Sequence, residues 1–212
     1  MTIAQGKFIT IEGGEGVGKS TNIACVESFL QSRSISFIKT REPGGTPLAE
    51  ELRKILLAPR EEKVCEKTEL LLMFAARAQH LQQVILPALQ QGIWVICDRF
   101  TDATYAYQGG GRGLSLQAIA TLEELVQEGL QPDLTLLLDV DVQTGLTRLN
   151  DRPATDRFER EQKDFFETVR AMYHQRAQQC PQRFRIVDAS QTLAAVQQDI
   201  IATLTKFCGT AQ

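Results

Sequence analysis

The sequence lacks the cysteine pattern of a metal site or a disulfide framework. Its five cysteines are widely scattered, and no two of them form a C-x-x-C pair. An odd, dispersed set of this kind predicts reduced thiols, as in a cytoplasmic protein. An excess of positive charge is also absent, because the net charge is -3 at pH 7. The chain therefore has no overall basic field that would attract nucleic acid.

Long apolar runs, repeats and low-complexity segments are missing as well. No apolar run approaches the length of a membrane span, and the first residues do not combine a basic segment with an apolar core, as a secretion signal would. We therefore expect no contact with a membrane. The 212 residues suffice for one sizeable core, and no linker divides them. The sequence predicts a single domain that spans residues 1–212.

A phosphate-binding loop is the clearest motif that the sequence does contain. The stretch GGEGVGKS matches the pattern G-x-x-x-x-G-K-[ST] at every fixed position. An apolar segment rich in β-branched residues precedes it and a helical pattern follows it, as the motif requires. The backbone N–H groups of such a loop surround a phosphate, its lysine reaches the terminal phosphates, and its serine binds Mg²⁺. The loop consists of Gly13, Gly14, Glu15, Gly16, Val17, Gly18, Lys19 and Ser20.

Five short apolar segments are predicted to be strands. Most lack an alternation of apolar and polar residues, which is typical of strands buried on both faces of a parallel sheet. Helical patterns separate them, so the sequence predicts an α/β fold, a three-layer sandwich with a five-stranded parallel sheet of P-loop NTPase type. A ligand would then bind at the carboxyl ends of the strands. The predicted strands are residues 7–12, 35–39, 93–98, 134–140 and 184–187.

Charged residues follow two of these strands. Arg41 lies beside glycines after the second strand, where a guanidinium can fork onto a phosphate; pairing with Glu42 at the surface is the alternative. Asp98 ends the third strand, where it can hold Mg²⁺ opposite Ser20. Arg99 is a second candidate for binding a phosphate, and an ion pair between Asp98 and Arg99 is the alternative.

A long helix predicted over residues 68–90 carries a ring and a guanidinium on one side. Phe74 and Arg77 are three residues apart. Together they suit a nucleobase, since the ring can stack on it and the guanidinium can hydrogen-bond its edge. The alternative is a core phenylalanine and an arginine whose charge reaches solvent. Pro87 lacks an N–H group and is expected to kink or end this helix.

Aromatic residues, an amide and a glycine run occupy residues 105–113. The Gln108 amide can both donate to and accept from a base edge. We interpret the glycines as a loop rather than as a second phosphate site. Asp139 and Asp141 close the fourth strand, and we interpret them as turn and helix-cap residues rather than metal ligands.

Residues 145–160 are rich in arginine and predict a mobile helical lid. They include Arg148, Arg152, Arg157 and Arg160, and a Pro-Ala-Thr segment interrupts the helical pattern. Such a lid can bring arginines over a reacting phosphoryl group and exclude water. A solvated helix face, with acidic residues offsetting the charge, is the alternative. From Phe165 onward, the sequence predicts a helix, a strand and a closing helix without further chemistry.

Together these stretches resemble the thymidylate kinases of the nucleoside monophosphate kinase family. The resemblance runs from about Phe8 to the last strand. It implies phosphoryl transfer from MgATP to dTMP, giving dTDP and ADP, in a homodimer. Its marks are the phosphate loop, R-E-P-G-G-T (41–46), F-A-A-R (74–77), D-R-F (98–100), A-Y-Q-G-G-G-R-G (106–113) and D-R-F-E (156–159).

The resemblance also implies binding roles for individual residues. Phe74 would stack on thymine, and Arg77 and Gln108 would address its edge. Tyr107 would pack under the deoxyribose, where a ribose 2′-hydroxyl would clash, and Glu15 would lie near the 3′-hydroxyl. The other implied contacts are Arg41, Pro43, Arg99 and Thr104 for dTMP, Gly13 to Ser20 with Thr21 and Arg148 for ATP, and Ser20 and Asp98 for Mg²⁺.

The catalytic residues implied by the resemblance include one arginine of the lid. Gly16 stands where some family members have a catalytic arginine, so the lid would supply that charge, from Arg152 as first candidate or Arg157 as second. Pro153 stands where glycine is common and stiffens the lid, and Ala103 replaces a common serine near the acceptor phosphate. The implied catalytic set is Glu15, Lys19, Arg99, Arg152 and Arg157.

Other functions are less consistent with the sequence. A kinase of the same fold with another small-molecule or nucleotide acceptor is the nearest alternative. A GTP-binding switch protein would need N-K-x-D and D-x-x-G segments, and neither occurs. A nucleic-acid-dependent ATPase would need a basic stripe, against which the net charge of -3 argues.

Overall fold

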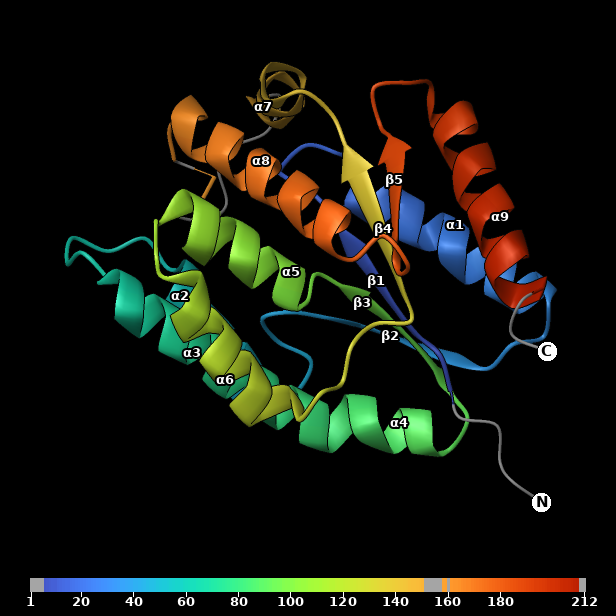
Figure 1. The fold of residues 1–212 in the computed structure, drawn as a ribbon, viewed down its shortest axis with the longest axis horizontal. Helices are drawn as coiled ribbons and strands as arrows, with labels where there is room; N and C mark the ends of the chain where they lie inside the picture. Colours follow the sequence, from blue (N-terminus) through green and yellow to red (C-terminus); the bar gives the residue numbers. More distant parts are fainter. Residues whose placement is uncertain (1–5, 151–157, 160, 210–212) are drawn as a thin grey trace.

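The centre of the molecule is a five-stranded parallel sheet (Figure 1). The structure is a computed structural model that describes residues 6–150, 158–159 and 161–209. The strand order is β2-β3-β1-β4-β5, so the strand that leads into the phosphate loop lies in the middle. The predicted α/β fold is confirmed. The strands are β1 (Phe8–Glu12), β2 (Phe37–Arg41), β3 (Trp94–Asp98), β4 (Leu134–Asp139) and β5 (Phe184–Asp188).

Helices cover both faces of this sheet. Helices α1 (Lys19–Ser32) and α9 (Leu193–Gly209) lie side by side on one face (Figure 1). The other face is covered mainly by α8 (Lys163–Gln179) and by the helices between β2 and β4. These are α2 (Pro47–Leu57), α3 (Glu66–His80), α4 (Leu86–Gln90), α5 (Thr101–Thr104) and α6 (Leu116–Gln127), with two π-helical segments, η1 (Leu81–Ile85) and η2 (Tyr105–Gly111); α7 (Val142–Asn150) follows β4.

Side chains of β1 alternate between the two cores. Ile9 and Ile11 pack with α1 and α9, whereas Phe8 packs with η1 and α4. Because the side-chain period of a strand is two, Glu12 points to the same face as Phe8, and it is fully buried. The sheet therefore holds a carboxyl group directly beneath the phosphate loop.

Strand β2 lies two residues further along the chain than predicted. The N–H of Ile35 donates to the Leu30 carbonyl at 3.0 Å, which closes the end of α1. At the other end, β2 pairs with β3 as far as Arg41, whose partner is Asp98. The pairing with β3 thus extends the strand to Arg41 and places this side chain at the sheet edge where a ligand would bind.

The helix that contains Pro87 does not end at the proline, so of the two predicted outcomes, a kink or an end, the end is wrong. Segments α3, η1 and α4 follow one another without interruption from Glu66 to Gln90. The π-helical turn Leu81–Ile85 comes immediately before the turn that contains the proline. A π turn is wider than an α turn, which accommodates the missing N–H and the proline ring. The helical pattern therefore continues past the proline.

The glycine run after Gln108 is helical, so the interpretation of these residues as a loop is wrong. Segment η2 runs from Tyr105 to Gly111 and packs against α8. A Cβ atom at Gly110 would lie 2.8 Å from the Thr168 carbonyl oxygen of α8. Glycine is needed here for close packing between the two helices, and this packing fixes the position of Gln108.

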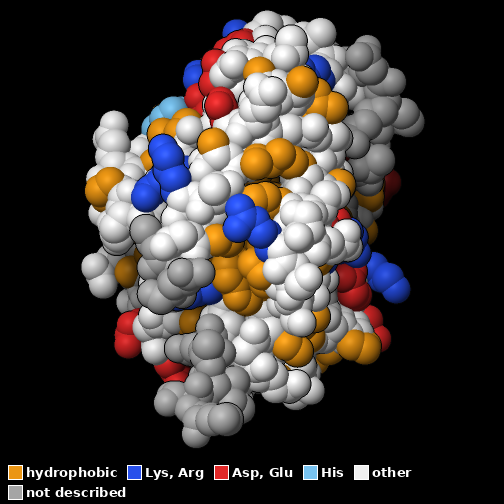
Figure 2. Space-filling view, turned by 90° about the vertical axis from the view of Figure 1, so that its right-hand side faces the viewer, with side chains coloured by type: hydrophobic (Ala, Val, Ile, Leu, Met, Phe, Trp, Pro, Cys, Tyr) orange, Lys and Arg blue, Asp and Glu red, His pale blue; other side chains and the backbone are white. Residues whose placement is uncertain are grey.

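Exposed apolar side chains occur on more than one face. Figure 2 shows the face at the right-hand side of Figure 1, where apolar side chains lie among charged ones. Two of the exposed apolar residues, Leu193 and Ile201, belong to α9. On α2 and α3, Leu48, Ile55 and Leu71 are 50%, 44% and 57% exposed. In the ranges that the structure describes, no helix has both the length and the apolar character needed to cross a membrane.

Candidate active site

The phosphate loop connects β1 to α1, and three of its glycines have backbone conformations that other residues rarely adopt. Gly16 has φ +71°, and a Cβ atom there would overlap the carbonyl group of Gly145. Only glycine fits such a position. Lys19 begins α1, and its Nζ donates to the carbonyl oxygens of Gly14 at 2.7 Å and Gly13 at 3.2 Å. Burial lowers the pKa of Lys19 to about 8, so the ammonium remains charged at neutral pH.

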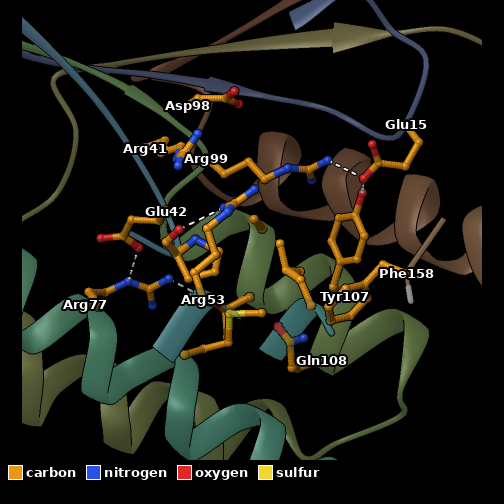
Figure 3. Close-up of a pocket in the computed structure, with 15 residues that line it drawn as sticks. Glu15, Arg41, Glu42, Arg53, Arg77, Asp98, Arg99, Tyr107, Gln108 and Phe158 are labelled. Atoms are coloured by element: carbon orange, nitrogen blue, oxygen red, sulfur yellow. Dashed lines mark hydrogen bonds and ion pairs between the residues drawn. The ribbon is translucent and has the colours of Figure 1, made fainter. Parts of the chain in front are cut away.

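A cleft opens beside this loop at the carboxyl ends of β2 and β3 (Figure 3). It encloses about 720 Å³ of space, including its open mouth, which suits a nucleotide-sized ligand. Its lining holds four guanidinium groups, from β2, α2, α3 and the residue after β3, together with the carboxyl groups of Glu15, Glu42 and Asp98. These arginines are Arg41, Arg53, Arg77 and Arg99.

Arg99 lies where the cleft meets the phosphate loop. Its backbone has φ +66°, a left-handed conformation that is uncommon for residues other than glycine and is enriched at active sites. The guanidinium donates to Glu15 Oε1 at 2.5 Å and lies 4.7 Å from the centre of the Tyr107 ring. The Tyr107 hydroxyl donates to the same oxygen of Glu15 at 2.8 Å. The structure thus brings three predicted site residues together, and Arg99 pairs with Glu15 rather than with Asp98.

Arg77 lies at the opposite end of the cleft and is 2% exposed. Its Nε donates to Glu42 at 2.7 Å, and its second terminal nitrogen donates to the Thr104 hydroxyl at 2.9 Å. The charge is paired inside the protein and does not reach solvent, contrary to the alternative considered from the sequence. Within the described ranges, Arg77 Nη1 is buried without a hydrogen-bond partner. This orphaned donor can bind a polar ligand atom.

The Phe74 ring lies against the Arg77 guanidinium, with 4.7 Å between the ring centre and the guanidinium carbon, and Phe74 is 2% exposed. The residues that line the cleft near it are Met73 and Arg77. Phe74 therefore supports Arg77 from behind the cleft wall in this structure. Stacking of Phe74 on a nucleobase stays a prediction.

Arg41 and Glu42 point in different directions, so the surface pair considered as an alternative is not formed. The Arg41 guanidinium donates to Glu50 at 2.9 Å. Glu42 is buried between Arg77 and His80, and its Oε1 lies 3.1 Å from His80 Nδ1. Pro43, another predicted residue, lines the cleft next to Glu42. The Arg41 side chain is half-exposed and also lines the cleft.

Gln108 lines the cleft with a fixed amide orientation. It is 1% exposed, and its Nε2 donates to Glu69 Oε1 at 2.7 Å. Because a carboxylate oxygen accepts hydrogen bonds, the amide nitrogen must face Glu69. The amide oxygen of Gln108 is then the atom available to accept from a ligand.

The two predicted magnesium ligands line a second cavity, together with Arg41. Asp98 Oδ1 is buried and has no hydrogen-bond partner within the described ranges. A carboxylate and a hydroxyl suit Mg²⁺, which keeps several positions for phosphate oxygens and water. No group of three or more His, Cys, Asp or Glu side chains in those ranges forms a metal site. Ser20 and Asp98 therefore fit a magnesium ion that is bound together with phosphates.

The predicted lid is described only in part. Helix α7 covers residues 142–150, and Arg148 on it donates to the Ala189 carbonyl at 3.1 Å. Arg152 and Arg157 lie outside the described residues. Phe158, just after them, lines the cleft. Thr21 is exposed on the first turn of α1.

The two aspartates after β4 have different roles. The N–H of Thr144 donates to Asp141 Oδ1 at 2.9 Å, so Asp141 caps α7 as predicted. Asp139 is not a turn residue: both of its oxygens accept from Arg170 at 2.8 Å, and His174 lies 3.1 Å from one of them. Helix α8 therefore carries ion-pair partners for the end of β4, although no further chemistry was predicted after residue 165.

Glu12 and Tyr173 also belong to the site and were missed from the sequence. Glu12 Oε1 accepts from the N–H of Phe100 at 2.7 Å, and Oε2 accepts from the Tyr173 hydroxyl at 2.9 Å. Arg99 donates to the same hydroxyl at 3.4 Å. Phe100 directly follows Arg99, so these bonds hold Arg99 from its backbone side and from its guanidinium. Tyr173 shares a helix face with buried Val169 and Phe166, and a buried tyrosine hydroxyl needs a partner, which was the available signal.

We expect Glu12→Gln to change how stability depends on pH. Burial, and next the charge of Asp102, raise the pKa of Glu12 from 4.5 to about 8. Because the folded-state pKa is raised, the contribution of the group to stability is full below pH 4.5 and is lost as pH rises through about 8. The variant should match the wild type near pH 5 and exceed it at about pH 9, by a few kcal/mol in order of magnitude.

Urea unfolding of both proteins at the two pH values measures this difference. Glu61→Gln, at an exposed position, is the matched control and should show no such change. A difference between Glu12→Gln and the wild type that is the same at both pH values would contradict the expectation.

The site defines a class of protein. The phosphate loop follows the middle strand of a parallel sheet, and the cleft beside it contains guanidinium groups and oxygen ligands suited to magnesium. These features are typical of a P-loop phosphotransferase that acts on a phosphorylated acceptor. The comparisons with known proteins then give the family. The family model for thymidylate kinase matches residues 11–200. This chain belongs to the thymidylate kinase family.

Individual relatives agree with the family model. A thymidylate kinase from Teredinibacter turnerae is 62% identical over 202 residues, which are 95% of this chain and 98% of the relative. One from Pseudomonas putida is 60% identical over 94% of this chain and 95% of the relative. The crystal structure of thymidylate kinase from Ehrlichia chaffeensis superposes with a TM-score of 0.75 at 32% identity, and the match covers 95% of this chain and 99% of that one.

Proposed function

We propose that the cleft beside the phosphate loop binds dTMP and that the loop itself binds ATP. The chain phosphorylates dTMP to dTDP, as membership of the thymidylate kinase family requires. The assignment of the cleft rests on one observation: the two ends of the cleft carry different polar groups. Arg41 and Arg99 lie at the strand ends beside the loop, whereas Arg77 and Gln108 lie at the far end with Thr104.

The two ends of the cleft match the two ends of dTMP. A dianionic phosphate would lie between Arg41 and Arg99, because guanidinium groups form forked hydrogen bonds with phosphate oxygens. A pyrimidine would lie at the far end, where Arg77 offers a donor and Gln108 an acceptor for an imide N–H. Tyr107 precedes Gln108 in the chain and hydrogen-bonds Glu15 at the loop end, so the sugar would lie beside Tyr107, with Glu15 on the side of the phosphates.

The reaction is a direct transfer between two phosphates. An oxygen of the dTMP phosphate attacks the γ-phosphorus of ATP and forms a new P–O bond, while the bond to the β–γ bridging oxygen breaks and ADP leaves. Both reactants are anions, so positioning and charge neutralisation are the main tasks of the protein. Lys19, Arg41 and Arg99 supply fixed positive charge for this purpose, and no covalent intermediate with the protein is needed.

Magnesium and the lid complete the proposal. Ser20 and Asp98 would hold Mg²⁺, which supplies further neutralisation of the phosphate charge when bound. We assign a transition-state charge to Arg152, or else to Arg157, and an adenine contact to Arg148, on the basis of the sequence resemblance. In this proposal, residues 1–212 form one domain, with the lid at about 145–160. The protein acts in the cytoplasm and binds neither nucleic acid nor a membrane.

We also propose that the chain forms a homodimer. Helices α2 and α3 pack against each other and expose Leu48, Ile55 and Leu71. Exposed apolar side chains on adjacent helices are typical of an interface between copies. Light scattering on the purified protein, compared with Ile55→Lys and Leu71→Glu, tests the proposal, because a dimer that uses this face should dissociate in both variants.

A panel of acceptors tests the proposed function. ADP release is measured with ATP and with dTMP, dUMP, CMP or AMP, each with and without Mg²⁺. We expect turnover with dTMP to exceed that with CMP or AMP by at least about a hundredfold, since the buried polar groups at the far end would be left unpaired by the wrong base. Turnover should require Mg²⁺. A preference for CMP or AMP would support the alternative of another acceptor and reject dTMP.

A further inference from the structure

Arg112 joins two sides of the acceptor cleft that come from distant parts of the chain. It follows η2, and its backbone N–H donates to the Tyr107 carbonyl at 2.9 Å. We propose that Arg112 is a positioning residue that holds the Gln108 side of the cleft against its Phe158 side and thereby determines the affinity for dTMP. This inference rests on the proposed function of the cleft.

On the Gln108 side, the connection runs through Glu69 of α3. Glu69 is 1% exposed, and its Oε1 accepts from both Gln108 Nε2 at 2.7 Å and Arg112 Nε at 3.4 Å. The same oxygen therefore orients the amide that faces the cleft and binds the arginine. The guanidinium places a positive charge beside the Glu69 carboxylate. Removing Arg112 would therefore alter the position of Glu69, the residue that orients the Gln108 amide.

On the Phe158 side, Arg112 makes contacts of two kinds. Its Nη1 forms an ion pair with Glu161 at 2.7 Å. The guanidinium carbon also lies 5.5 Å from the centre of the Phe158 ring and 4.9 Å from that of Phe165. Phe158 lies near the end of the predicted lid, and Glu161 comes three residues later, just after it. Arg112 is thus in contact with the part of the predicted lid that lines the cleft.

Tyr107 completes the connection between the two sides. Its ring packs edge-on against Phe158 at 5.9 Å and against Phe165 at 6.1 Å. Tyr107 also binds Glu15 near the phosphate loop. A shift of Phe158 would therefore displace the Tyr107 ring as well as the side chains at the far end of the cleft. Both of these residues line the acceptor cleft, and neither belongs to the loop proposed to bind ATP.

The geometry requires an arginine rather than any cation. The guanidinium is planar and donates in two directions, so it reaches Glu69 with one nitrogen and Glu161 with another while its face lies on aromatic rings. With 17% of the side chain exposed, these bonds are only partly screened by water. A lysine provides one charged group and cannot hold both carboxylates in the same way.

Calorimetric titration of dTMP into the full chain without ATP tests the proposal. We expect Arg112→Met to raise the Kd for dTMP about tenfold and Arg112→Lys to raise it less, with the Kd for ATP changing less than about twofold in both. Glu161→Gln, which keeps the shape of the side chain, should raise the Kd for dTMP in the same direction. The double variant Arg112→Met with Glu161→Gln should bind dTMP no more weakly than Arg112→Met alone, because both changes break the same ion pair.

The matched control is Arg185→Met, since Arg185 lies on β5 and donates to the nearby carbonyl groups of Pro181, Gln182 and Phe184, away from the cleft lining. It should bind both nucleotides like the wild type. Equal losses of dTMP and ATP affinity in Arg112→Met would indicate a general structural role and overturn the proposal. Unchanged dTMP affinity in Glu161→Gln and Arg112→Lys would also overturn it, even if Arg112→Met did not fold. A wild-type chain that does not bind dTMP would instead reject the proposed function.

Discussion

Arg99→Met is expected to lower kcat/KM for dTMP by about 10³-fold, in the range seen when an arginine that stabilises transferring phosphate is lost. Arg99 lies at the junction of the cleft and the phosphate loop, and its guanidinium forms a 2.5 Å ion pair with Glu15. Methionine would remove the positive charge and leave the Glu15 carboxyl group facing the incoming phosphate. The expected loss therefore has two parts, a missing attraction and an added repulsion.

Two further variants separate these parts. Arg99→Lys keeps the charge without the forked donors and should recover a portion of the activity. In the variant Arg99→Met with Glu15→Gln, the repulsion is absent, so the additional loss relative to Glu15→Gln alone should be smaller than in the wild-type background. Initial rates at varied dTMP and saturating ATP measure all of these effects. An Arg99→Met protein with near-normal kcat/KM would show that Arg99 does not hold the acceptor phosphate.

Lys19→Met is expected to lower kcat by about 10³-fold, since an aligned donor to the transferring phosphate is usually worth about 10²–10³. The ammonium lies inside the phosphate loop and bonds to the carbonyl oxygens of Gly13 and Gly14. Methionine has a similar length and no charge, so the loop should keep its shape while losing its cation. Single-turnover measurements with preformed ATP complex report on this step directly.

The matched control for Lys19→Met is Lys63→Met. Lys63 pairs with Glu66 at 3.0 Å with 84% of its side chain exposed, and such a surface pair contributes little. Its kcat should stay within about twofold of the wild type. If Lys19→Met raised the KM for ATP and left kcat unchanged, Lys19 would contribute to ATP binding alone and not to the transition state.

The sequence was sufficient for the parts of the site that depend on strand ends. In a parallel sheet, all carboxyl ends meet at one edge, so the residues after β1, β2 and β3 had to lie close together. The structure places the phosphate loop, Arg41, Asp98 and Arg99 in this way. The prediction needed only the approximate position of each strand, and a two-residue error in β2 did not affect it.

Pairings between distant residues were beyond the sequence. Tyr173 and Glu12 are separated by 161 positions, and Arg77 and Glu42 by 35. Nothing in local composition indicates which buried charge meets which partner. Glu42 illustrates the difficulty, because its neighbour Arg41 was the candidate considered from the sequence, whereas Arg41 binds Glu50 and Glu42 binds Arg77. The π-helical turns were missed for a similar reason, since close packing against α8, and not periodicity, decides the conformation of η2.

The strand order has a consequence for how substrate choice can change. The groups that would bind the two phosphates lie at the ends of the neighbouring strands β1, β3 and β2, whose separation is set by backbone hydrogen bonds. The groups that would face the nucleobase stand instead on α3 and η2. Altering the helices can therefore adapt the enzyme to a different base while the spacing between donor and acceptor stays constant. Selection for new acceptors should accumulate changes in α3 and η2 and leave the sheet untouched.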